Sequence, residues 1–141
     1  MSNAIHHSHL IVFGRYPVVG ATKTRLIPAL GPVGAAALQQ RLTEKTVAAA
    51  RRAAAGQAVQ LVFCHEGGEA RQIERWLGFS ERDCVPQAGN DLGQRMLRAI
   101  QSAFDQGAGR VVLVGTDIPG LQAATLQAAF DRLTDHDLVL G

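Results

Sequence analysis

A glycine-punctuated segment rich in cations follows the first apolar run of the chain. Residues 14–26 read GRYPVVGATKTRL and include no carboxylate; the charged residues are Arg15, Lys23 and Arg25. Gly14 and Gly20 permit tight turns and a close approach of the backbone to a ligand. Backbone N–H groups beside ammonium and guanidinium side chains suit a di- or triphosphate. The segment therefore predicts a phosphate site, and the alternative that its residues leave open is a solvated basic loop.

The spacing of this segment differs from that of a P-loop. A P-loop requires Gly-x-x-x-x-Gly-Lys-[Ser/Thr]. Here five residues separate Gly14 from Gly20, and Ala21 and Thr22 intervene before Lys23. The sequence therefore disfavours a kinase-like phosphoryl transferase that uses a P-loop.

A carboxylate follows another apolar run, in the segment GTDIPGL at 115–121. Asp117 would emerge where a strand ends. One aspartate is a poor metal cage by itself, but it suits Mg²⁺ or Mn²⁺ when phosphates and water supply the other ligands. We expect Asp117 to bind such a substrate-associated metal; the alternative is that it caps the helix that follows.

Amide and carboxylate groups gather in the segment QAGNDLGQRM at 87–96. Gln87, Asn90 and Asp91 lie next to glycines, including Gly93, at the expected entry to a helix. They could bind a base or ribose by hydrogen bonds. The equally supported alternative is a helix N-terminus capped by Asp91.

These segments are joined by alternating strand-like and helix-like patterns. We predict strands at 9–13, 58–64, 110–114 and 137–140, with a short one at 83–86, and helices at 33–55, 69–77, 91–106 and 122–133. Strands that are apolar along their length and alternate with helices favour a mostly parallel sheet in a three-layer α/β/α sandwich. We expect the first strand to lie between the second and the strand at 110–114. Ligands of such sheets bind beyond the carboxyl ends of the strands, where the three segments would meet.

The composition of the chain indicates its domain number, its class of partner and its cellular location. A chain of 141 residues with 47% hydrophobic residues, two cysteines and a net charge of +2 predicts one globular domain. Its charge pattern does not indicate a nucleic-acid partner, and no apolar run is long enough to span a membrane. We therefore expect a cytoplasmic protein. Residues 1–8, which contain the Ser-Asn-Ala of an expression tag, are expected to form a flexible N-terminus before the domain at 9–141.

Two further features receive structural interpretations. Cys64 at a predicted strand end is interpreted as a buried small hydrophobic residue, because nothing in its surroundings would lower its pKa. His65 and Glu66 follow that strand and could line the cleft, but we interpret them as a surface turn.

The segments FGRYPVVGATKTRL, QAGNDLGQRM and GTDIPGL, in this order, resemble the nucleotide-diphospho-sugar transferase superfamily, which has the glycosyltransferase-A fold. The similarity is greatest to the radical-SAM/selenodomain-associated transferase family, type 1. It implies that Lys23 and Arg25 match cationic positions of the phosphate loop and that Asp117 matches the metal-binding aspartate.

The resemblance implies a metal-dependent transferase that uses a nucleoside triphosphate or a nucleotide-diphospho-sugar, by glycosyl or nucleotidyl transfer. The alternative is a nucleotide-binding module without turnover. Family members continue past the 137–141 segment with an acceptor-binding part that residues 1–141 do not contain, so the activity of this chain alone is left open. No residue is assigned as catalytic, and a homo-oligomer is one of the oligomeric states that the sequence allows.

Overall fold

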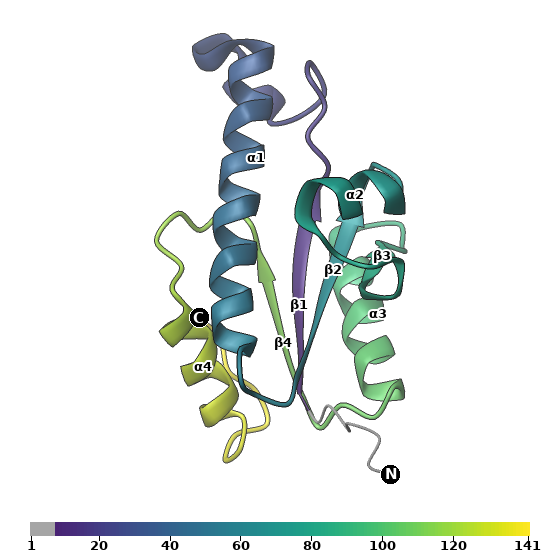
Figure 1. Ribbon diagram of the computed structural model, residues 1–141, viewed down its shortest axis with the longest axis vertical. Coiled ribbons are helices and arrows are strands. Elements are labelled where there is room, and N and C mark those ends of the chain that lie inside the picture. Colours follow the sequence, from purple (N-terminus) through teal and green to yellow (C-terminus); the bar gives the residue numbers. More distant parts are fainter. Residues whose placement is uncertain (1–7) are drawn as a thin grey trace.

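The computed structural model describes residues 8–141, and they form one parallel sheet with helices on both faces (Figure 1). The strands are β1 (Ser8–Arg15), β2 (Val59–Glu66), β3 (Cys84–Pro86) and β4 (Arg110–Gly115), in the order β3-β2-β1-β4. All three strand pairs are parallel. The predicted α/β architecture is confirmed, including the central position of the first strand.

The helices are α1 (Ile27–Ala54), α2 (Ala70–Leu77), α3 (Leu92–Asp105) and α4 (Ala123–Arg132), with short 3-10 turns η1 (Thr24–Leu26) and η2 (Glu81–Asp83). All four predicted helices are present. Helix α1 is interrupted at Gly31, whose φ of 74° is not helical, and Pro32 follows it. The long helix therefore starts after the Gly31-Pro32 signal, as predicted, and an additional turn precedes it.

The apolar side chains of β1 point alternately to the two faces of the sheet and contribute to a hydrophobic core on each face. Leu10 and Val12 pack with residues of α1, α2 and α4 on one face of the sheet. Ile11 and Phe13 point to the opposite face and pack with residues of α3 and β4. Successive strand residues point to opposite faces, so a continuous apolar run is buried on both sides. Figure 1 shows α1 and α4 on one side of the sheet and α3 on the other.

The predicted strand at 137–140 is wrong. No described strand pairs with these residues, and β4 remains the edge of the sheet. Leu138 and Leu140 are 72% and 85% exposed. The apolar pattern indicated a strand, but a strand also needs a hydrogen-bonded neighbour, and residues 139–141 instead line a groove along β4 and α4.

The expected flexible N-terminus lies mostly outside the described residues, which exclude 1–7. Its last residue, Ser8, already belongs to β1 and is buried, and it pairs with Val59 and Arg110. The first strand therefore includes Ser8, one residue before the predicted start at His9.

The packing around Gly14, near the end of β1, leaves no space for a side chain at this position. A Cβ atom there would lie 2.8 Å from the Phe63 ring and 3.3 Å from the Thr116 methyl group. Phe63 is completely buried, so it has little freedom to move away. Gly115 at the end of the neighbouring β4 has open space where a Cβ would be.

We expect Gly14→Ala to lower the free energy of unfolding by about 1–3 kcal/mol, the usual cost of overpacking a core. Gly115→Ala is the matched control and is expected to change it by less than about 0.5 kcal/mol. Urea denaturation of both variants checks this. Equal stability of the two variants would contradict the packing role of Gly14.

Candidate functional site

A cavity of about 480 Å³ lies at the carboxyl ends of the strands. Residues from all three segments singled out in the sequence line it. The first contributes Gly14, Arg15, Thr22 and Lys23; the second contributes Gln87, Leu92 and Met96; the third contributes Gly115, Thr116, Asp117 and Ile118. The parallel sheet brings these segments together because all its strands end at the same edge.

An ion pair closes one side of this cavity. The Lys23 Nζ atom lies 2.6 Å from Asp117 Oδ1, although 94 residues separate the two in sequence. Lys23 is the one described non-glycine residue with a positive φ, at 48° with ψ at 49°. Residues other than glycine rarely adopt this left-handed backbone conformation. Here it occurs just before η1, and the Lys23 ammonium group points toward the end of β4.

A second ionic cluster forms around Glu66 at the end of β2. Glu66 Oε2 accepts hydrogen bonds from Arg15 Nε at 3.0 Å and Nη2 at 2.8 Å. Glu66 Oε1 lies 3.2 Å from Arg95 Nη1 of α3. The Arg15 hydrogen bonds and, to a lesser degree, Arg95 lower the pKa of the Glu66 carboxyl. The carboxylate thus pairs with Arg15, which lines the cavity, and with Arg95 of α3.

The turn before α3 is fixed by Gln87 and Gly89. The Gln87 amide donates to the carbonyl oxygens of Gly14 and Cys64, each at 3.3 Å, and so ties the turn to β1 and β2. Gly89 has a φ of 143°, and a Cβ there would lie 2.9 Å from the Arg95 backbone nitrogen. Its carbonyl accepts a hydrogen bond from Arg95 Nε. The turn therefore requires a glycine at this position.

Five residues predicted for the site do not line the cavity, namely Gly20, Arg25, Asn90, Asp91 and Gly93. Gly20 lies in the loop with a φ of 86°. Arg25 lies in η1 and is exposed. Asp91 accepts the backbone N–H of Gln94 at 2.8 Å and caps α3, which is the structural alternative weighed in the sequence.

The sequence analysis preferred a surface turn over a place at the cleft for Glu66, and it did not single out Arg95. The interpretation of His65 and Glu66 as a surface turn is wrong, because both belong to β2; His65 is buried, and Glu66 lines the cavity. The signal was available: Glu66 ends a parallel strand, as Asp117 follows one. Arg95 had no such signal, since its role depends on how α3 is placed against β2.

The residues at the cavity fit a divalent cation held jointly with a phosphate ligand. Asp117 is 73% exposed in its side chain, so its carboxylate can be reached from solvent. The described residues include no group of three or more His, Cys, Asp and Glu side chains able to hold a metal alone. A hard cation bound mainly by phosphate and water needs one such carboxylate.

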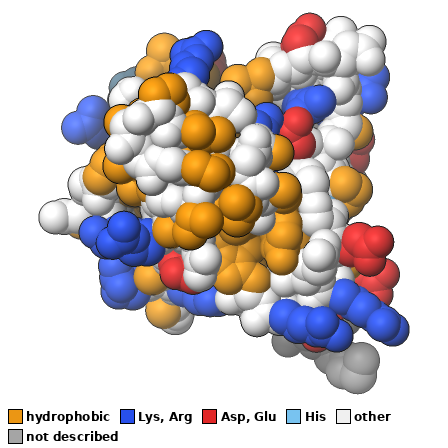
Figure 2. Space-filling view, turned by 90° about the horizontal axis from the view of Figure 1, so that it is seen from above, with side chains coloured by type: hydrophobic (Ala, Val, Ile, Leu, Met, Phe, Trp, Pro, Cys, Tyr) orange, Lys and Arg blue, Asp and Glu red, His pale blue; other side chains and the backbone are white. Residues whose placement is uncertain are grey.

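Two exposed apolar side chains line the cavity. Ile118 and Leu92 are 48% and 62% exposed. Segment 18–33 carries further exposed apolar side chains that do not line this cavity, namely Val18, Val19, Leu26, Leu30 and Val33. Figure 2, which views the molecule from above, shows hydrophobic side chains gathered on the end of the molecule where α1 begins. The cavity thus combines charged groups with two exposed apolar side chains.

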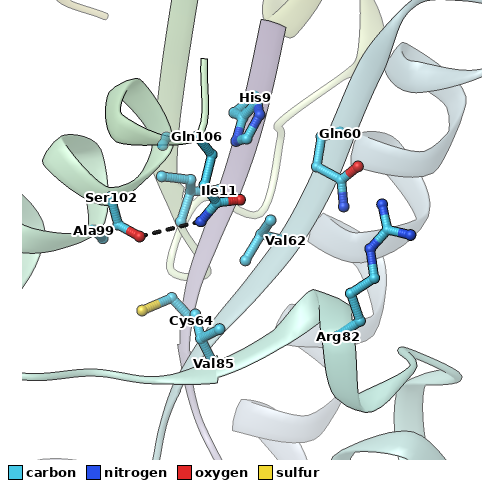
Figure 3. A pocket seen from close by; sticks show the side chains of 11 residues that line it. His9, Ile11, Gln60, Val62, Cys64, Arg82, Val85, Ala99, Ser102 and Gln106 are labelled. Carbon is cyan, nitrogen blue, oxygen red and sulfur yellow. Dashed lines mark hydrogen bonds between the residues drawn. The ribbon is translucent and has the colours of Figure 1, made fainter. Parts of the chain in front are cut away.

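Another cavity, of about 350 Å³, lies between α3 and the sheet, away from the three segments (Figure 3). His9, Gln60 and Ser102 are among its lining residues. Cys64 also lines it, and burial raises the pKa of this thiol to about 12. A thiol with such a pKa stays protonated and is a poor nucleophile, so the interpretation of Cys64 as a buried residue is confirmed.

The lowered pKa of Glu66 makes a pH-dependent contribution to stability. Its folded pKa lies below the ordinary value of 4.5, so the contribution is present above pH 4.5 and is lost as the pH falls through the folded pKa. We expect wild type to exceed Glu66→Gln in urea midpoint at pH 7 and the gap to shrink at pH 3.5. A gap that stays constant with pH would contradict the ion-pair role.

Comparison with known proteins completes the description of the site. A crystal structure from Desulfovibrio desulfuricans G20, described as a "putative nucleotide-diphospho-sugar transferase", is similar with a TM-score of 0.77 and 34% identity. The match covers 92% of this chain and 55% of that one, so this chain spans about half the length of that relative. No curated protein matches significantly. No helix within residues 8–141 is long and apolar enough to cross a membrane. Residues 46–141 match the family "Uncharacterized protein conserved in bacteria (DUF2064)", and the chain belongs to this family.

Proposed function

We propose that this chain is the nucleotide-binding part of a metal-dependent transferase that acts on a nucleoside triphosphate or a nucleotide-diphospho-sugar. The observation that carries the proposal is the convergence of Lys23, Arg15 and Asp117 on one cavity at the carboxyl edge of a parallel sheet. The likeness to a structure named as a nucleotide-diphospho-sugar transferase supports it. Glycosyl transfer and nucleotidyl transfer both use such a site.

In this proposal the cations of the cavity bind the phosphates. Lys23 would donate an ammonium hydrogen bond to a phosphate oxygen, and Arg15, which also lines the cavity, would contribute positive charge. Charge-assisted hydrogen bonds of this kind are stronger than neutral ones. Glu66 positions Arg15 and Arg95, since it accepts hydrogen bonds from the first and pairs with the second.

Asp117 would hold Mg²⁺ or Mn²⁺ beside the phosphates. When bound, such an ion neutralises the charge that develops on a leaving diphosphate or pyrophosphate. Gln87 follows β3 and Asp117 follows β4, at opposite ends of the strand order, and the Gln87 amide would bind the sugar or base. The exposed side chains of Leu92 and Ile118 would cover uncharged parts of the ligand.

One observation favours the second candidate, a nucleotide-binding module without turnover. Both carboxylates that line the cavity within residues 8–141 are engaged in ion pairs, Glu66 with two arginines and Asp117 with Lys23. Neither is a free general base. A transferase would then need further groups from the acceptor side, such as those in the part of the relative that this chain does not span.

We expect Lys23→Ala to weaken nucleoside diphosphate binding about tenfold or more, because one charge-assisted hydrogen bond contributes about 1.5–3 kcal/mol. Arg25→Ala is the matched comparison. The sequence analysis placed Arg25 in the phosphate site as well, but Arg25 lies outside the cavity, so we expect a loss of less than about threefold. Isothermal titration at fixed ionic strength measures both. Equal losses, or none in Lys23→Ala, would contradict the placement of the phosphates at Lys23.

The metal assignment is tested with Asp117→Asn. The amide retains the size of the side chain but loses the charge that holds a hard divalent cation. We expect Mn²⁺ to strengthen nucleotide binding in wild type and to have no effect in Asp117→Asn, measured by titration with and without Mn²⁺. The same strengthening in both proteins would show that Asp117 is not a ligand. No strengthening in either would favour the metal-independent binding module.

A further inference from the structure

We propose that the Lys23–Asp117 ion pair is a closed state of the site, which an anionic phosphate ligand and a divalent cation open together. In this state the Lys23 ammonium occupies the place at Asp117 that the cation would take. Each visiting ion therefore frees the residue that the other one needs, and each strengthens the binding of the other. The inference rests on the proposed function in taking a phosphate and a divalent cation as the two visiting groups.

The geometry of the pair supports this competition. The 2.6 Å separation of Lys23 Nζ and Asp117 Oδ1 leaves no room for a cation between these two atoms. The lysine side chain is 16% exposed, whereas that of the aspartate is 73% exposed. The ammonium is thus largely enclosed by protein at Asp117 Oδ1, whereas the carboxylate can be reached by a ligand from solvent.

The backbone at Lys23 shows that the pair is held in place by its surroundings. Its left-handed φ and ψ of 48° and 49° are unfavourable for a lysine. Thr22 is buried beside it, and its hydroxyl accepts a hydrogen bond from the Val18 backbone at 2.6 Å. The Lys23 carbonyl accepts the backbone N–H of Leu26 at 2.8 Å. The loop presents the ammonium to β4 without any ligand.

The strength of the pair allows it to open. An ion pair with one largely exposed partner usually changes an equilibrium by no more than about fivefold. Phosphate ligands bind cations more strongly than that through several charge-assisted hydrogen bonds. The closed state therefore lowers the affinity for either ion alone by a small, measurable factor and does not block the site.

The opposite role for Asp117 would be to orient Lys23 toward a phosphate. An orienting carboxylate helps anion binding, so its removal weakens that binding even without metal. A competing carboxylate hinders anion binding, so its removal strengthens it. The two roles predict effects of opposite sign, which makes the metal-free anion affinity decisive.

The first experiment titrates pyrophosphate in the presence of EDTA into wild type, Asp117→Asn, Lys23→Met and the double variant. We expect Asp117→Asn to bind pyrophosphate more tightly than wild type. Loss of the negative charge of Asp117 would by itself also strengthen pyrophosphate binding. The double-mutant cycle therefore isolates the part of the gain that depends on the Lys23–Asp117 pair. The gain should be about two- to fivefold larger with Lys23 present than in the Lys23→Met background. Asp131→Asn, at an exposed position of α4, controls for net charge.

The second experiment measures Mn²⁺ binding without nucleotide by the electron paramagnetic resonance signal of free Mn²⁺. We expect Lys23→Met to bind Mn²⁺ about two- to fivefold more tightly than wild type, because Asp117 is released. Lys45→Met, at an exposed position of α1, controls for the lost positive charge and should gain less. Thermal unfolding of each variant verifies that it is folded.

The outcomes separate this inference from the proposed function. Weaker or unchanged pyrophosphate binding in Asp117→Asn would overturn the closed pair while leaving a phosphate site in place. If none of the four proteins binds pyrophosphate, the proposed function loses its basis, and the Mn²⁺ titration alone decides on the pair. If the gain in Mn²⁺ affinity of Lys23→Met does not exceed that of Lys45→Met, the proposed closed ion pair would be overturned.

Discussion

The parallel pairing of β1 between β2 and β4 is the constraint on which the rest of the structure depends. The register places Phe13 beside both Cys64 and Gly115, so the three strands end within two residues of one another. Segments that follow these strands must therefore meet, whatever their separation in sequence. The pairing also buries β1 on both faces, which gives each side of the sheet its core. The same arrangement that stabilises the domain creates the cavity.

Electrostatics then organises this edge. Two carboxylates and three cations line or border the cavity, and the ion pairs of the edge join elements that are distant in sequence. Glu66 connects β1 to α3 through Arg15 and Arg95, and Asp117 connects the end of β4 to the first loop through Lys23. These contacts define the walls of the cavity before any ligand is present. Such preorganisation lowers the cost of binding an anion.

Much of this architecture could be predicted from the sequence, because apolar runs and helical periodicity are local signals. The strands β1, β2 and β4 and the rule for parallel sheets were enough to bring Lys23 and Asp117 to one edge. The apolar run at 137–140 was wrongly predicted as a strand. A strand needs a hydrogen-bonded neighbouring strand, which the local apolar pattern does not reveal. Glu66 was interpreted as part of a turn although it ends a parallel strand, and Arg95 escaped prediction because its contact with Glu66 depends on where α3 lies. The cap at Asp91 and the exposed Arg25 show that composition alone cannot separate a ligand contact from a structural one.

The central claim is that the cavity at the carboxyl edge binds the phosphates of a nucleotide. The most direct measurement is a titration of the ¹⁵N-labelled 15.0 kDa protein with a panel of nucleoside diphosphates, followed by NMR chemical shifts with and without Mg²⁺. We expect shift changes at residues 14–23, 87–92 and 115–118 and none around His9, Gln60 and Ser102 in the other cavity. Changes confined to the other cavity, or no changes with any nucleotide, would contradict the claim.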